Sequence, residues 1–186
     1  MLPTNNIIFW KTDSEERQEA IIFRRKVDTI LENEKTVASE LNNEQEKYQL
    51  HLQHATIYAK TQMLNRDAKA MYESKVPNEN HTAYTVAVAD FLNAPDIHEI
   101  DLLLYSGEAG DTIRVKVTDD FKVLFVKVVI MGHDGNILES GDALQEGDSP
   151  DWIYTATQHN TDFDGGKILI QASDLPGNIS QKEETI

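Results

Sequence analysis

The second half of the chain consists of short apolar stretches that recur at regular intervals, each bounded by turn residues. The seven stretches cover about 98–105, 111–118, 122–131, 136–140, 152–158, 166–173 and 178–185. In the second, Ile113, Val115 and Val117 alternate with polar residues, which is the period of a strand with one buried face. Seven short strands separated by turns predict a β-sandwich rather than a barrel or a parallel sheet.

Turn chemistry supports this division into strands. The clearest signal is Asp134-Gly135, because a type I′ hairpin turn needs positive φ at both central positions and favours this pair. Similar glycine-rich or aspartate-rich breaks lie at 106–111, 119–120, 147–150, 164–166 and 176–178. We therefore expect hairpin connections and antiparallel strands.

The first half of the chain carries helical patterns instead. Residues 13–41 contain no proline or glycine, and apolar side chains fall at helical spacing, at Phe23, Val27, Ile30, Val37 and Leu41. This heptad-like seam has two interpretations: an amphipathic helix that packs within its own chain, or a coiled-coil face that meets another subunit.

Three further helices are expected at 44–64, 66–75 and 83–92. Asn65 and Thr82 have side chains suited to capping the last two, and Val76-Pro77 ends the third helix of the series. The fourth, 83–92, also contains β-branched residues and could form a strand. The pattern divides the chain into a helical module of three or four helices, 1–97, and a strand-rich part, 98–186.

Several landmarks in the strand-rich part resemble those of bacterial immunoglobulin-like domains. They are Gly110-Asp111-Thr112-Ile113, Thr118-Asp119-Asp120-Phe121, His133-Asp134-Gly135, the stretch Trp152 to Thr157, and Ala172 to Asn178. The resemblance covers residues 108–186, and the whole chain is similar to bacterial proteins in which a helical module precedes such a domain. It implies an α+β chain with a C-terminal seven-stranded antiparallel Ig-like β-sandwich, and it implies no activity.

The charge of the chain restricts its partners. The net charge is −15, and residues 98–186 hold 6 basic against 17 acidic side chains, or −11. Such a surface repels phosphate backbones and anionic lipids, so we expect neither nucleic-acid binding nor membrane insertion. The first residues contain only four consecutive apolar side chains, 7–10, and no basic stretch precedes them. We expect no signal peptide or transmembrane segment, and a cytoplasmic chain or one exported without a cleavable signal.

The stretch 121–131 differs from the other expected strands because it is apolar on both faces. Val123, Phe125 and Val129 lie on the face that a two-layer sandwich would leave in water. We expect the helices of residues 13–92 or a second subunit to cover them. The candidate interaction residues are therefore Phe23, Val27, Ile30, Val123, Phe125 and Val129.

No catalytic motif is present. The chain contains no cysteine, no G-x-S-x-G, no phosphate-binding glycine loop and no H-E-x-x-H. His51 and His54 share one side of an expected helix, but no third ligand accompanies them, so a solvated face is the simpler interpretation. We expect no catalytic residue and no organic cofactor.

Calcium is the one ligand that the sequence suggests, because calcium takes carboxylate oxygens from acidic loops. The candidate ligands are Asp119, Asp120, Asp162, Asp164 and Asp174, with Asp148 and Asp151 also in expected loops. Solvated turn residues are the competing interpretation, since the chain has no complete EF-hand loop.

The sequence thus favours a non-enzymatic structural or protein-interaction module that acts through its helical part. The alternative is a module that binds carbohydrate or another small ligand, with Trp10, Trp152 or Tyr154 in a groove. Alternation places Trp152 and Tyr154 on the core face, which favours burial and the first interpretation.

Overall fold

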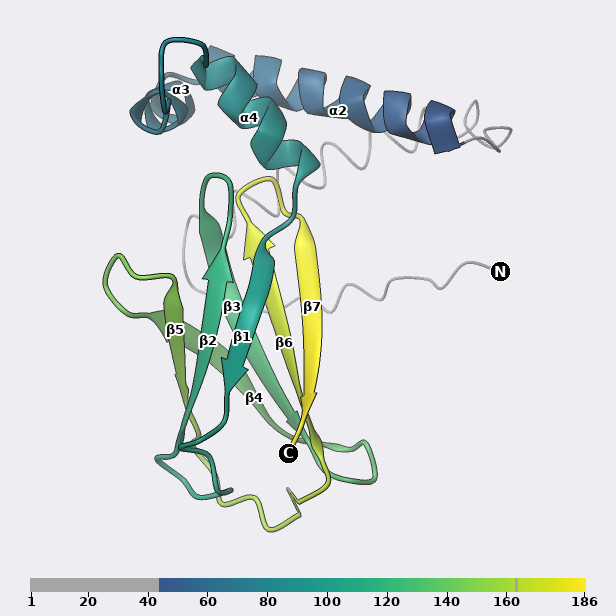
Figure 1. The fold of residues 1–186 in the computed structure, drawn as a ribbon, viewed down its shortest axis with the longest axis vertical. Coiled ribbons are helices and arrows are strands. Elements are labelled where there is room, and N and C mark those ends of the chain that lie inside the picture. Colours follow the sequence, from purple (N-terminus) through teal and green to yellow (C-terminus); the bar gives the residue numbers. More distant parts are fainter. Residues whose placement is uncertain (1–43, 163) are drawn as a thin grey trace.

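The computed structural model describes residues 44–162 and 164–186, and it confirms an α+β chain in which helices precede strands (Figure 1). The expected helix over 13–41, with Phe23, Val27 and Ile30, and also Trp10, lies outside the described residues. The described helices are α2 (Glu44–Leu64), α3 (Arg66–Ser74) and α4 (Ala83–Leu92). The strands are β1 (Asp96–Asp101), β2 (Thr112–Thr118), β3 (Val123–Met131), β4 (Ile137–Gln145), β5 (Asp151–Thr155), β6 (Lys167–Asp174) and β7 (Ile179–Thr185).

The helix boundaries follow from capping side chains. Asn65 accepts hydrogen bonds from the backbone N–H groups of Asp67 and Ala68 at the start of α3. Thr82 and Thr85 form a reciprocal capping box at the start of α4. The predictions of helices over 44–64, 66–75 and 83–92 are confirmed to within one residue at each described end. None of the described helices is both long and apolar enough to span a bilayer.

All seven strands are antiparallel to their neighbours, in the order β1-β2-β5-β4-β3-β6-β7. The two end strands approach each other, so the sheet curls until it is nearly barrel-shaped (Figure 1). The ammonium of Lys182 on β7 donates to the carbonyl oxygens of Ile97 (3.2 Å) and His98 (2.6 Å) on β1. The hydroxyl of Ser180 also donates to the carbonyl oxygen of Pro95. Side chains thus close the gap that backbone pairing leaves open.

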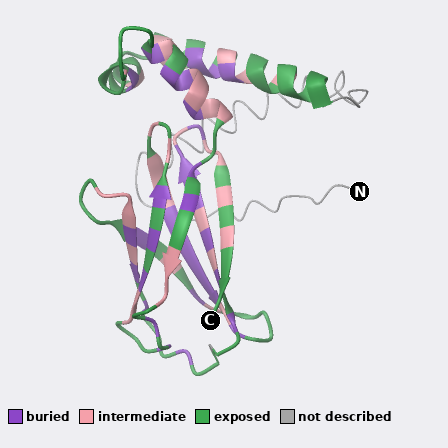
Figure 2. Ribbon diagram, in the orientation of Figure 1, coloured by how far each residue is buried: buried purple, intermediate pink, exposed green. Residues whose placement is uncertain are grey.

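The interior of the curled sheet is the main core. Along β2 the expected alternation is confirmed, with Ile113, Val115 and Val117 buried and their neighbours more exposed (Figure 2). Trp152 and Tyr154 of β5 are 6% and 4% exposed, as the alternation predicted. They therefore belong to the core and do not line a groove at the surface.

The predicted type I′ turn at Asp134-Gly135 is wrong. Among the described residues only glycines have positive φ, so Asp134 does not adopt the required conformation, whereas Gly135 has φ 81°. The carbonyl oxygen of Gly132 accepts from the N–H of Gly135, and the N–H of Gly132 donates to Asn136. The register of β3 against β4 also shifts beside this turn. One glycine and a bulge reverse the chain where two positive φ values were expected.

The expectation that helices cover the second face of β3 is not met by α2, α3 and α4. These three helices lie across one end of the sheet, and the body of β3 runs away from them (Figure 1). Val129 is nevertheless buried, while Val123 and Phe125 are half-buried. The part of the expectation that concerns residues 13–43 lies outside the described residues.

Candidate functional site

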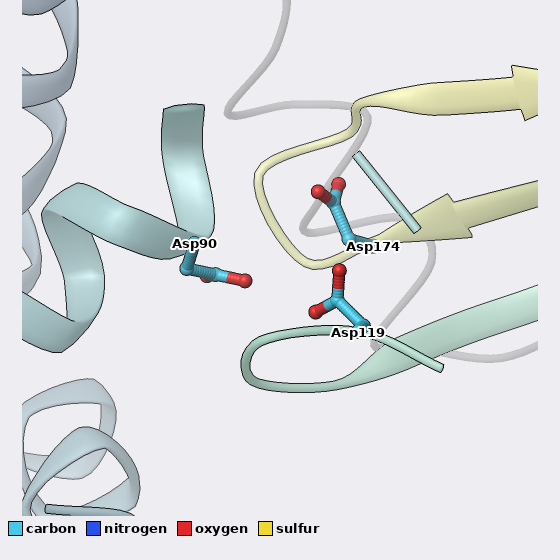
Figure 3. A group of neighbouring side chains, drawn as sticks. All are labelled: Asp90, Asp119 and Asp174. Atoms are coloured by element: carbon cyan, nitrogen blue, oxygen red, sulfur yellow. The ribbon is translucent and has the colours of Figure 1, made fainter. Parts of the chain in front are cut away.

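The most unusual group of polar side chains lies where the helices meet the sheet. Asp90 comes from the last turn of α4, Asp119 from the turn between β2 and β3, and Asp174 from the end of β6 (Figure 3). One carboxylate oxygen of each lies within 4.8 Å of the others. We call these three residues the junction triad. Asp90 and Asp174 are 0% exposed, and Asp119 is half-buried.

Asp90 is held by the helical part. The hydroxyl of Tyr72 on α3 donates to Oδ2 of Asp90 at 2.5 Å, and the hydroxyl of Tyr58 on α2 lies 2.6 Å from that of Tyr72. Since Tyr72 has one proton and gives it to Asp90, Tyr58 donates to Tyr72. The hydrogen bonds from Tyr58 through Tyr72 to Asp90 therefore end on Oδ2 of Asp90. Oδ1 of Asp90 is buried and has no hydrogen-bond partner.

Asp119 is held by its own turn. Its Oδ2 accepts from the N–H groups of Phe121 (3.0 Å) and Lys122 (2.8 Å), which fixes the reversal between β2 and β3. Its Oδ1 is buried and has no hydrogen-bond partner, like Oδ1 of Asp90. The turn is also packed against the helices, because the ring of Phe121 stacks on that of Tyr72 with centroids 4.3 Å apart.

Asp174 organises the turn between β6 and β7. Its Oδ1 accepts from the N–H groups of Gly177 (2.8 Å) and Asn178 (2.6 Å). Its Oδ2 accepts from the side-chain amide of Asn178 at 2.7 Å. The same amide reaches the carbonyl oxygens of Asp90 (3.2 Å), Phe91 (3.1 Å) and Asn93 (3.0 Å) at the end of α4. Asn178 therefore ties the helical part to the sheet.

Burial and mutual repulsion dominate the electrostatics of the junction triad. Burial first, and repulsion from nearby carboxylates second, raise the pKa of Asp90 to about 8 and that of Asp174 to about 7, although hydrogen bonds act in the opposite direction. Burial also raises the pKa of Asp119. The C-terminal end of α4 adds to this effect at Asp90, because the helix dipole is negative there. Three carboxylates in this position favour a bound proton or a bound cation.

The structure brings together two of the five sequence candidates for calcium. Asp119 and Asp174 belong to the junction triad, whereas Asp120 lies outside it at the surface and accepts from the amide of Asn93 at 2.5 Å. The other two, Asp162 and Asp164, are exposed, and no group of three possible ligands among the described residues includes them. Asp90 was not among the sequence candidates, because these lie in expected loops, whereas Asp90 lies within an expected helix, 83–92.

A further buried carboxylate, that of Glu139 on β4, accepts hydrogen bonds at both oxygens. Its Oε1 accepts from Tyr154 Oη (2.8 Å) and from the N–H and hydroxyl of Thr157 (both 2.6 Å). Its Oε2 accepts from the amide of Asn160 at 3.2 Å, which also donates to Tyr105 Oη. Although burial would raise the pKa of Glu139, these hydrogen bonds hold it below its usual value. The group has no free acceptor aimed at a cavity, so it is structural.

A hydroxyl and an imidazole also meet on the outside of the sheet. Nε2 of His98 lies 2.6 Å from the hydroxyl of Thr118, and Nδ1 lies 3.5 Å from a carboxylate oxygen of Asp96. All three residues are exposed on paired strands. These contacts lie at the surface, and their simplest interpretation is that they join the side chains of β1 and β2.

Comparison of the chain with protein-family models, curated proteins and solved structures finds no match. Function must therefore be argued from the junction and from the surfaces that the fold presents.

Proposed function

We propose that the chain is a non-enzymatic structural module. In it, an Ig-like β-sandwich holds the helices α2, α3 and α4, here called the helical head, in a fixed orientation, and the helical head contacts other proteins. The observation that carries the proposal is the side-chain amide of Asn178. It joins the β6–β7 turn to the carbonyl oxygens that end α4, more than eighty residues away in sequence. A linker of three residues, 93–95, connects the two parts, and the amide removes the freedom that such a linker would leave.

Strand order supports the Ig-like part of the proposal. If β1 to β7 are matched in sequence to strands A to G, the observed order becomes A-B-E-D-C-F-G. This is the order obtained by joining the two sheets of an immunoglobulin constant-type domain, ABED and CFG, at their D and C edges. The chain departs from antibody domains in having no disulfide, and its core tryptophan lies on β5, the fifth strand.

Hydrogen exchange tests the fixed orientation. We expect the amides of α4 and those of β6 and β7 to exchange as one cooperative unit, and Asn178→Ala to accelerate exchange in α4 by about 10-fold. Asn136→Ala is the matched control, because this exposed asparagine lies in the β3–β4 turn, away from the helices. Equal exchange of α4 in the wild type and in Asn178→Ala would show that the amide does not fix the helical head.

The helical head offers the surface better suited to a protein contact, and we propose that its partner is a second copy of the chain. Tyr48 and Leu52 near the start of α2 are 62% and 39% exposed. The part from 98 to 186 has a net charge of −11, so two such parts repel each other, whereas the part from 1 to 97 holds 11 basic against 15 acidic side chains. Contact between helices avoids most of this repulsion.

Light scattering over a range of concentrations tests the contact. We expect the full chain to form a dimer and Tyr48→Ser to shift the mass towards that of a monomer. Leu144→Ser is the control, because Leu144 is an even more exposed apolar side chain, 76%, and lies on the sheet. A monomer at every concentration, or a loss of the dimer in Leu144→Ser alone, would contradict association through α2.

Ligand binding by aromatic side chains is the weaker alternative. Trp152 and Tyr154 are buried, and a shallow groove beside β1 is lined by Glu99, Ile100, Asp101, Leu102, Leu103 and Glu184, without an aromatic ring. In a Trp10→Phe variant, Trp152 is the remaining tryptophan. We expect its fluorescence to be blue-shifted and unaffected by glycans.

A further inference from the structure

We propose that the junction triad, Asp90, Asp119 and Asp174, binds one calcium ion between the end of α4 and the two turns of the sheet. The site goes beyond the structural role proposed above, because it adds a ligand and does not depend on any partner. Figure 3 shows the carboxylate of Asp90 pointing out of the helical part towards those of the other two.

Two unpartnered oxygens carry this inference. Oδ1 of Asp90 and Oδ1 of Asp119 are buried and accept no hydrogen bond, although every other carboxylate oxygen of the triad accepts at least one. Burying a carboxylate oxygen without a hydrogen-bond partner costs more free energy than burying a neutral polar oxygen without one. Natural proteins rarely contain such an unpartnered buried oxygen. Both oxygens belong to carboxylates of one converging group, so a single cation held among the three carboxylates can serve both residues.

Within the described residues, hydrogen bonds stabilise the triad but no basic side chain neutralises its charge. No lysine, arginine or histidine of the described chain forms an ion pair with any member of the triad. Asp90 also lies in the last turn of α4, where a negative charge meets the negative end of the helix dipole. A divalent cation removes the repulsion among the carboxylates and the repulsion between Asp90 and the helix end.

The donor set and its spacing favour calcium. All three side chains offer oxygen, which suits hard cations and not zinc or copper. Two oxygens bound to one calcium at 2.3–2.6 Å lie at most about 5 Å apart, and those of the triad lie within 4.8 Å. Two oxygens bound to one magnesium ion at 2.0–2.1 Å lie at most about 4 Å apart. Carboxylate oxygens as far apart as 4.8 Å would therefore have to move closer together to bind magnesium.

Two carboxylates of the junction triad also have raised pKa values. At neutral pH burial keeps Asp90 and Asp174, whose pKa values are about 8 and about 7, partly protonated. Calcium must then displace protons, so its affinity rises with pH.

Titration calorimetry of the chelator-treated full chain with calcium chloride at pH 7.5 tests the site. We expect one calcium per chain in the wild type, and a dissociation constant at least about 10-fold weaker in Asp90→Asn. Asp164→Asn is the matched control and should bind as the wild type does. Asparagine can still accept from Tyr72 and can donate to Asp119, so Asp90→Asn is expected to fold, which circular dichroism checks.

Terbium luminescence provides a second measurement. Tyr72, which touches Asp90, should sensitise bound terbium when it is excited, and calcium should displace the signal. No heat and no luminescence up to about 10 mM calcium, ten times the weakest dissociation constants of calcium modules, would overturn the proposal. So would unchanged binding in Asp90→Asn, binding that is lost in Asp164→Asn, or tighter binding of magnesium. Hydrogen exchange in a chelator tests the fixed helical head separately.

Discussion

The hydroxyl of Tyr72 donates to Oδ2 of Asp90 at 2.5 Å, whereas Oδ1 of the same carboxylate is buried without a hydrogen-bond partner. This contact joins the interior of the helical part to the junction triad. Tyr72 is 0% exposed and lies in the helical core, where the hydroxyl of Tyr58 is its other partner. The orientation of Asp90 is therefore set by packing within the helices, and not by the sheet that it faces.

Tyr72→Phe should destabilise the chain by about 1–3 kcal/mol in the absence of divalent cations. The change keeps the ring but leaves Oδ2 of Asp90 and the hydroxyl of Tyr58 without this partner in the core. Urea unfolding followed by circular dichroism measures the loss. Tyr48→Phe is the control, because Tyr48 is exposed, and its unfolding midpoint should not move. Equal midpoints for both variants would show that the hydroxyl of Tyr72 contributes nothing.

Stability without cations should fall as the pH rises from 5 to 8. The folded pKa values of Asp90 and Asp174, about 8 and about 7, lie above the unfolded value near 4. Between these limits the folded chain binds more protons than the unfolded chain, so the free energy of unfolding decreases with pH. When one carboxyl group is protonated in the folded chain and ionised in the unfolded chain, the free energy of unfolding falls by about 1.4 kcal/mol per pH unit.

Urea unfolding at pH 5, 6.5 and 8 in a chelator measures this slope. Asp90→Asn should flatten it, because asparagine does not titrate, whereas Asp164→Asn should leave it unchanged. Excess calcium should also flatten it, since the cation takes the place of the protons. A wild-type stability that rises over the same interval would contradict the raised pKa values.

Local signals in the sequence predicted the described helices to within one residue and a strand near each of β1 to β7, although β1 begins two residues earlier and β4 ends five residues later than expected. Side-chain caps such as Asn65 and Thr82 act within three residues, and the alternation of β2 needs only one strand. The turn at Asp134-Gly135 was misassigned because its type depends on the register shift between β3 and β4, which arises only when the two strands pair. The residue pair alone does not contain that information.

The junction triad could be predicted only in part, because it joins three segments that are distant in sequence. Asp119 and Asp174 were among the calcium candidates, but nothing local separates them from Asp162 and Asp164. Asp90 had one usable signal, since it lies three and four residues after Ala87 and Val86, on the buried face of α4. A carboxylate on the apolar face of a helix indicates a partner from elsewhere in the fold.

Gly141→Ala should destabilise the sheet by about 1–3 kcal/mol. A Cβ at this position would lie 2.8 Å from Cε2 of Tyr154. The ring of Tyr154 is buried and its hydroxyl donates a hydrogen bond to Glu139, so displacing the ring costs free energy. Thermal unfolding measures the effect, and Ser140→Ala on the same strand is the control. An unchanged melting temperature in Gly141→Ala would show that the ring of Tyr154 relaxes freely.

Glu139→Gln should cost about 2 kcal/mol at pH 7, because four hydrogen bonds to a carboxylate become bonds to a neutral amide. The folded pKa of Glu139 is depressed, so this stabilisation is present above the unfolded value near 4.3 and is lost as pH falls through the folded value. The difference in the free energy of unfolding between wild type and Glu139→Gln should therefore shrink below about pH 4.

Urea unfolding at pH 7 and pH 3 measures this difference. Glu183→Gln is the control, because Glu183 is an exposed glutamate paired with Lys167, and this variant should change little at either pH. A constant difference at both pH values would show that the charge of Glu139 does not contribute.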